Sequence, residues 1–144
     1  MAMVFCDVGA DLVLGTFLRA VAVQDLKLKL FATDVTPNAN GTDTTATYTE
    51  AAGGGYAEIT LSRGTGWTIT TVNDPSDAIY TQQTFTFTGA LTTNAKIYGY
   101  YVTDNAGTTL LWAERLAVYF QPANNGDKLL ITPKVQMSYG TPAA

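Results

Sequence analysis

The side chains of this sequence that could do chemistry are carboxylates, because it holds twelve Asp and Glu residues and no histidine. Without histidine the chain lacks the commonest general base and the commonest metal ligand. The chemistry that remains is glycoside hydrolysis, which uses two carboxyl groups ~5–9.5 Å apart across a cleft. Glu58 and Glu114 are the candidate pair, since each falls within an expected strand. Each also fits the solvent-facing side of an alternating strand, and no activating neighbour can be named, so we expect no enzyme activity.

Calcium binding is the second possibility. Oxygen ligands gather in three expected turns: Asp74 with Asp77, Asp104 with Asn105, and Asn124–Asp127. None matches the Asp-x-Asp-x-Asp-Gly spacing of a calcium loop. Asp and Asn also stabilise turns by bonding to their own backbone, so the sequence favours a structural role and no bound metal or cofactor.

Two further motifs have a structural interpretation. Gly53–Gly55 are consecutive glycines without the Gly-Lys-Ser/Thr of a phosphate-binding loop, which predicts a bend or bulge. The single cysteine, Cys6, excludes an intrachain disulfide and a Cys-rich zinc site, and we expect it to be a small apolar residue.

Composition limits the partners. The net charge is −4, the pI is near 4.5, and the eight Lys and Arg residues are spread singly, so we expect no nucleic-acid binding. The apolar N-terminal stretch is interrupted by Asp7, Asp11 and Arg19, which predicts neither a membrane span nor a signal peptide. We therefore expect synthesis in a cytoplasm and no membrane partner. Only 14% of the residues are charged, so the surface must be built from Thr, Ser, Asn and Gly, or be covered by neighbours.

Alternating apolar residues separated by turns predict an all-β protein. The expected strands are Asp25–Ala32, Thr44–Thr49, Tyr56–Leu61, Trp67–Val72, Gln82–Gly89, Lys96–Thr103, Thr108–Leu116 and Lys128–Met137, the last broken or placed at an edge by Pro133. Eight or nine short strands of this spacing indicate an antiparallel β-sandwich or jelly-roll-like fold. We expect one domain over residues 1–144, with the sandwich at 25–137 and a polar C-terminal tail at 138–144.

The N-terminal arm, residues 1–24, contains a possible short helix. Leu14, Phe17, Leu18 and Val21 follow the i, i+3, i+4, i+7 spacing of one helical face, although the valines would also suit a strand. This apolar face could cover the end of the sandwich or pack on a neighbouring subunit.

Aromatic residues make a second candidate contact surface. The expected strand Lys96–Thr103 is apolar on both faces: alternation places Tyr98 and Tyr100 on one side and Ile97 and Tyr101 on the other. Such a strand is either central in the sandwich or pressed against another chain. Together with Trp112, these tyrosines are the candidate contacts with a partner or a sugar, although core packing would also explain them.

Several passages together resemble small virion proteins of tailed bacteriophages. The passages are Leu28–Pro37 (LKLFATDVTP), Glu50–Ala57 (EAAGGGYA), Gln82–Gly89 with Tyr98-Gly99-Tyr100, Leu111–Arg115 (LWAER) and Asn125–Thr132 (NGDKLLIT). In this order they are similar to phage structural proteins that include capsid cement (decoration) proteins and tail or fibre components. The resemblance covers nearly the whole chain, and its motifs are structural rather than chemical.

The resemblance implies a role in the virion. Cement proteins of this kind are β-rich, often trimeric, and seated at the junctions between capsomers. The expectation is therefore a homotrimer on the capsid surface that binds the major capsid protein and stabilises the head without chemistry. The alternative is a tail fibre or baseplate module that binds a host glycan through its aromatic residues. The resemblance supplies no catalytic or ligand-binding residues.

Overall fold

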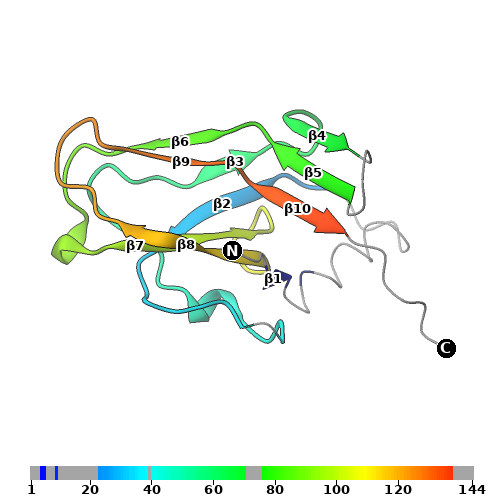
Figure 1. The fold of residues 1–144 in the computed structure, drawn as a ribbon, viewed down its shortest axis with the longest axis horizontal. Coiled ribbons are helices and arrows are strands. Elements are labelled where there is room, and N and C mark those ends of the chain that lie inside the picture. Colours follow the sequence, from blue (N-terminus) through cyan, green and yellow to red (C-terminus); the bar gives the residue numbers. More distant parts are fainter. Residues whose placement is uncertain (1–3, 6–8, 10–22, 39, 71–75, 138–144) are drawn as a thin grey trace.

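The structure is a computed structural model, and it describes residues 4–5, 9, 23–38, 40–70 and 76–137. Two layers of antiparallel β-sheet face each other, as Figure 1 shows. The all-β, sandwich-like class expected from the sequence is confirmed. The helix expected around Leu14–Val21 and the tail at 138–144 lie outside the described residues.

The first layer is a five-stranded sheet. Its strands, in spatial order, are β1 (Val4–Phe5), β8 (Leu110–Phe120), β7 (Ile97–Thr103), β2 (Leu26–Phe31) and β3 (Ile59–Leu61). All four pairings are antiparallel. The central position of β7 agrees with the double-sided apolar pattern of its sequence.

The second layer consists of two small antiparallel sheets placed end to end (Figure 1). In one half β4 (Trp67–Thr70), β5 (Ser76–Tyr80) and β10 (Lys134–Met137) pair, and in the other β6 (Gln83–Thr86) pairs with β9 (Lys128–Ile131). Pro133 separates β9 from β10, as its missing N–H predicts. Its carbonyl oxygen accepts a hydrogen bond from the Tyr80 amide at 2.8 Å, so the two halves stay joined.

The main core lies between the layers. Leu26, Leu28 and Leu30 alternate with Lys27 and Lys29 along β2, so the leucines are buried and the lysines lie on the outer face of the sheet. Other side chains of this core come from both layers: Leu61, Tyr80, Phe85, Phe87, Ile97, Tyr100, Val102, Leu111, Trp112 and Ile131.

A second, smaller core covers part of the outer face of the five-stranded sheet. Phe31, Tyr101 and Leu110 point outward from the sheet and pack with Tyr48, which lies in the long segment between β2 and β3. This segment lies below the sheet in Figure 1. The sequence pattern did not predict this second buried layer.

The prediction of an edge strand at Thr44–Thr49 is wrong. The chain forms a 3₁₀ turn at Thr45–Thr47, where the Thr44 amide donates to the Thr47 hydroxyl at 3.1 Å. Threonine hydroxyls compete for backbone groups in this way, and the competition outweighs the strand preference of the residue type. A second 3₁₀ turn is present at Thr92–Asn94.

Irregular pairing between β7 and β8 changes which side chains face the core. Gly99 pairs with Arg115, and Ile97 pairs with Phe120. Between these two pairs β8 advances by five residues while β7 advances by two. Ile97 and Tyr100 therefore both face the main core, and Tyr98 packs on the outer cluster instead. The sequence-based assignment of Tyr98 and Tyr100 to one face is thus corrected, because an irregular register breaks the simple alternation.

The three glycines form a bend, as predicted. Gly53, Gly54 and Gly55 have φ angles of 79°, 58° and 75°, which a side chain would strain. The Gly54 carbonyl accepts a hydrogen bond from Thr88 at 2.8 Å and so joins the bend to the second layer.

Candidate interaction surface

Three of the aromatic residues expected to contact a partner are buried inside the chain. Tyr100, Tyr101 and Trp112 have exposed fractions of 3%, 3% and 2%. They therefore build the core of this chain, and the expectation that they form an outer contact is corrected. Leu14, Phe17, Leu18 and Val21 lie outside the described residues.

Tyr98 is the exception, because it takes part in a surface row of aromatic and charged side chains. We call Lys96, Tyr119, Tyr98, Arg115 and Asp34 the aromatic row. Lys96 Nζ lies 4.1 Å from the centre of the Tyr119 ring, and the Tyr119 and Tyr98 ring centres are 6.1 Å apart. The Arg115 guanidinium lies 5.2 Å from the Tyr98 ring centre. Arg115 also donates to Asp34 Oδ1 at 2.6 Å, which completes the row.

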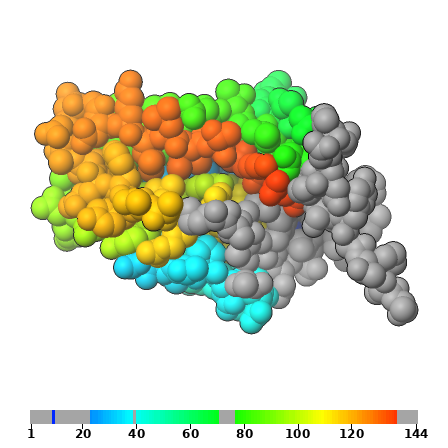
Figure 2. Space-filling view, in the orientation of Figure 1, coloured from blue at the N-terminus to red at the C-terminus, as the bar shows by residue number. Residues whose placement is uncertain are grey.

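The irregular end of β8 is what exposes this row. Ala117, Val118 and Tyr119 are three consecutive exposed residues in an eleven-residue strand. Val118 is 75% exposed and Tyr119 48%. Figure 2 shows the β8 region, coloured yellow to orange, on the visible face, close to the cyan segment that follows β2. The strand expected from the sequence ends at Leu116 and so omits Tyr119, although the apolar run Ala117–Phe120 was a signal that the strand continues.

A cluster of four charged side chains occupies the outer face of β2 and β3. Lys29 Nζ lies 3.0 Å from both Glu50 Oε2 and Glu58 Oε2, and Lys27 Nζ lies 3.2 Å from Glu58 Oε1. Partial desolvation raises the pKa of Glu58, but the hydrogen bonds and charges of Lys29 and Lys27 outweigh it and hold that pKa below its ordinary value. Glu58 therefore stays ionised and paired, which does not suit a general acid.

Tyrosine hydroxyls complete this cluster. Tyr56 donates to Glu50 Oε1 at 3.0 Å and accepts the Leu30 amide at 3.1 Å, where β3 no longer pairs with β2. Burial and the neighbouring Glu50 raise the pKa of Tyr56. Burial, together with Glu50, raises the pKa of Tyr101 to about 12. Both phenols thus remain protonated and act as structural donors.

The two candidate catalytic carboxylates lie on opposite faces of the five-stranded sheet. Glu58 pairs with Lys27 and Lys29 on the outer face. Glu114 accepts a hydrogen bond from Tyr100, whose ring belongs to the core between the layers. A sheet separates the two groups, so they do not form a glycosidase pair across one cleft.

The carboxylates of the candidate calcium turns bond to their own surroundings. Asp104 accepts from the Thr108 and Thr109 amides at 2.8 and 3.0 Å. Asp127 accepts from the Ala123 and Asn124 amides at 2.8 and 2.9 Å. Asp77 pairs with Lys134 at 3.0 Å and accepts from Gln136. Asp74 lies outside the described residues. The structural role favoured for Asp104 and Asp127 is thus what the geometry shows.

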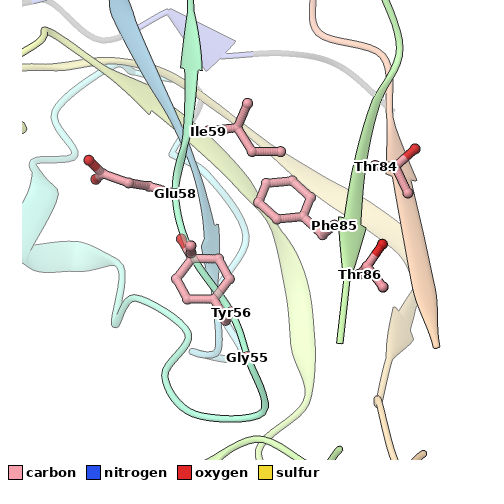
Figure 3. Close-up of a pocket in the computed structure, with 8 residues that line it drawn as sticks. Gly55, Tyr56, Glu58, Ile59, Thr84, Phe85 and Thr86 are labelled. Atoms are coloured by element: carbon pink, nitrogen blue, oxygen red, sulfur yellow. The ribbon is translucent and has the colours of Figure 1, made fainter. Parts of the chain in front are cut away.

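A small groove opens at one edge of the sandwich, between segment 55–59 and β6. Its volume is about 210 Å³. Figure 3 shows Ile59 and Phe85 directed toward each other across it, and Glu58 directed away. The Tyr56 and Phe85 rings stack inside with their centres 5.9 Å apart. The groove therefore has a mixed lining, in which Thr84 and Thr86 accompany the apolar side chains, and Glu58, the carboxylate of its lining, belongs to the charged cluster.

Within the ranges that the structure describes, no three His, Cys, Asp or Glu side chains gather as a metal site. Across the same ranges, no helix is long and apolar enough to cross a membrane. Comparison of the chain with models of known protein families, with curated proteins and with solved structures gave no match.

Proposed function

We propose that this chain is a structural protein of a tailed-bacteriophage virion, and more specifically a capsid cement protein that stabilises the head through contacts. In this role it binds the major capsid protein from the outside and associates with copies of itself. The proposal begins from the resemblance of the sequence passages to phage virion proteins.

One structural observation supports it: the passages that carry the resemblance meet one another in the fold. Three hydrogen bonds join them across long stretches of sequence, at 2.6 Å from Arg115 to Asp34, 2.8 Å from Thr88 to Gly54, and 2.8 Å from Phe87 to Asp127. The similarity therefore lies in the framework of a β-sandwich. A framework in which the two candidate catalytic carboxylates, Glu58 and Glu114, lie on opposite faces of a sheet suits a protein that works through contacts.

The alternative, glycan binding by a tail fibre or baseplate module, has less support. Its suggested platform, Trp112, is only 2% exposed. The surface tyrosines Tyr98 and Tyr119 each have a cation over the ring. A sugar stacks on an open ring face, and the cation already occupies one of the two faces of each ring.

The experiment that tests the proposal locates the protein in the particle. Purified virions of the phage that encodes it are analysed by mass spectrometry, and heads with and without the protein are imaged by electron microscopy. We expect extra density at capsomer junctions and heads that resist heat better when the protein is bound. Density confined to the tail, or absence from the virion, would show that the proposal is wrong.

A further inference from the structure

The aromatic row carries opposite charges at its two ends. Lys96 lies at one end and, in the part of the chain that the structure describes, forms no ion pair. Asp34 lies at the other end, where it is paired with Arg115 but remains 65% exposed. Between them lie the Tyr119 and Tyr98 rings, with their centres 6.1 Å apart. The row thus has a positive end, an aromatic middle and, at its other end, the Arg115–Asp34 ion pair with its exposed carboxylate.

This composition favours a protein as the partner. Tyr and Arg are the residue types most enriched in the energetic centres of protein interfaces. The cations over Tyr98 and Tyr119 already orient both rings, so little side-chain entropy would be lost when a partner packs against them.

The order of charges identifies the partner. When two copies of the row lie antiparallel, Lys96 of each meets Asp34 of the other, and the tyrosines meet at the centre. A surface that is complementary to itself under a half-turn is what a two-fold contact requires. We propose that the aromatic row is a two-fold contact between two copies of this chain. This inference does not depend on the proposed place in a virion.

The contact is small, and we expect the dimer to be weak. A row of five side chains covers less than the ~800 Å² per partner of a standard stable interface. Its charged ends are exposed, so added salt weakens it. Dimerisation should therefore be visible only at high protein concentration and low ionic strength.

Sedimentation velocity of the full chain tests the proposal. The protein concentration is varied from about 5 µM, where a weak dimer is dissociated, to about 1 mM, where it forms. We expect a concentration-dependent shift from monomer to dimer. Lys96→Glu and Asp34→Lys should each raise the dissociation constant at least about tenfold, because each places like charges at both ends of the contact. An equal mixture of the two variants should associate again, since the carboxylate introduced in one copy then faces the ammonium group introduced in the other.

Two comparisons separate the local effect of a charge on association from the effect of the net charge of the protein. Asp34→Lys lowers the net negative charge, so a purely global effect would strengthen association, whereas a local contact is weakened. Lys128→Glu is the matched control: it makes the same charge change as Lys96→Glu, on an exposed residue of the other layer, and should leave association within about twofold. Tyr119→Ala tests the aromatic middle independently and should also weaken the dimer.

Thermal melts of every variant establish that it folds, and only folded variants are compared. A wild-type chain that stays monomeric over the whole concentration range would overturn the inference. So would a dimer or larger oligomer that Lys96→Glu, Asp34→Lys and Tyr119→Ala leave unchanged.

Discussion

At the scale of single residues, Gly99 is the position with the least room. A Cβ built there would overlap the carbonyl oxygen of Glu114 and the ring of Phe31. Gly99 allows β8 to approach β7 closely while Phe31 packs across the strand. The glycine is therefore a packing requirement, because its φ is not in the left-handed region.

We predict that Gly99→Ala destabilises the fold by about 2 kcal/mol or more, since backbone must move to admit the methyl group. The measurement is the urea midpoint of unfolding. Gly89→Ala is the control, because nothing lies within 4 Å of a Cβ at Gly89. Equal midpoints for the two variants would contradict the packing argument.

Asp104 stabilises the turn between β7 and β8. It is only 8% exposed. Burial raises the pKa of its carboxyl, but the amides of Thr109 and Thr108 and the Thr108 hydroxyl outweigh this, and the pKa is lowered. Asp104→Ala leaves these amides without their acceptor and should cost about 1–3 kcal/mol of unfolding free energy. Asn105→Ala, at an exposed position in the same turn, should change it by less than about 0.5 kcal/mol.

At the scale of elements, one side chain attaches the long segment after β2 to the sheet. Arg115 on β8 donates to Asp34 Oδ1 and, at 2.8 Å, to the Val35 carbonyl. The same segment covers the second core through Tyr48. Arg115 therefore connects β8 to a segment that lies 80 positions earlier in the chain.

We predict that Arg115→Met loosens this segment while leaving the sandwich folded. Amide hydrogen exchange should become faster for Ala32 and Thr49, which bond to Thr49 O and to the Thr33 hydroxyl respectively. Protection of Phe87, in the other layer, should not change. Uniformly faster exchange would instead mean that Arg115 supports the whole domain.

How far the sequence predicts these elements depends on what determines each one. β2, β6 and β9 follow from local alternation, which the sequence displays directly. β5 was missed, because the turn expected at Asp74 and Asp77 overlaps the start of this strand. The face reversal at Tyr98 and the exposure of Tyr119 depend on the register between β7 and β8, which is a non-local property. The aromatic row could therefore not be predicted from the sequence, although Tyr98 was predicted as a contact residue.

At the scale of the whole molecule, the absence of histidine and the paired carboxylates determine the pH dependence. The pKa values of Asp77, Asp104 and Asp127 are lowered, as is that of Glu58. A carboxyl group with a lowered folded pKa contributes stability that is present above its ordinary pKa and lost as pH falls through the folded one. The ordinary values are 3.8 for Asp and 4.5 for Glu.

We predict a urea midpoint that is flat from about pH 6 to about pH 8, because no side chain has its ordinary pKa in that range. The midpoint should fall once the pH drops below about 4.5, as these carboxyl groups become protonated. Glu58→Gln should lower the midpoint at neutral pH, and its difference from the wild type should shrink in acid. A transition centred near pH 6.5 would contradict this account.

The turn Asn124–Asp127 has a consequence for the chemical ageing of the protein. Asparagine followed by glycine loses ammonia when the glycine amide nitrogen attacks the side-chain carbonyl, forming a succinimide that water opens to aspartate or isoaspartate. The Gly126 amide is held in a 2.8 Å hydrogen bond to Phe87 O, and the Gly41 amide in a 3.0 Å bond to Asn38 O. Both attacking nitrogens are thus held away from the adjacent asparagines, so deamidation at Asn125 and Asn40 should be slower in the folded protein than in urea.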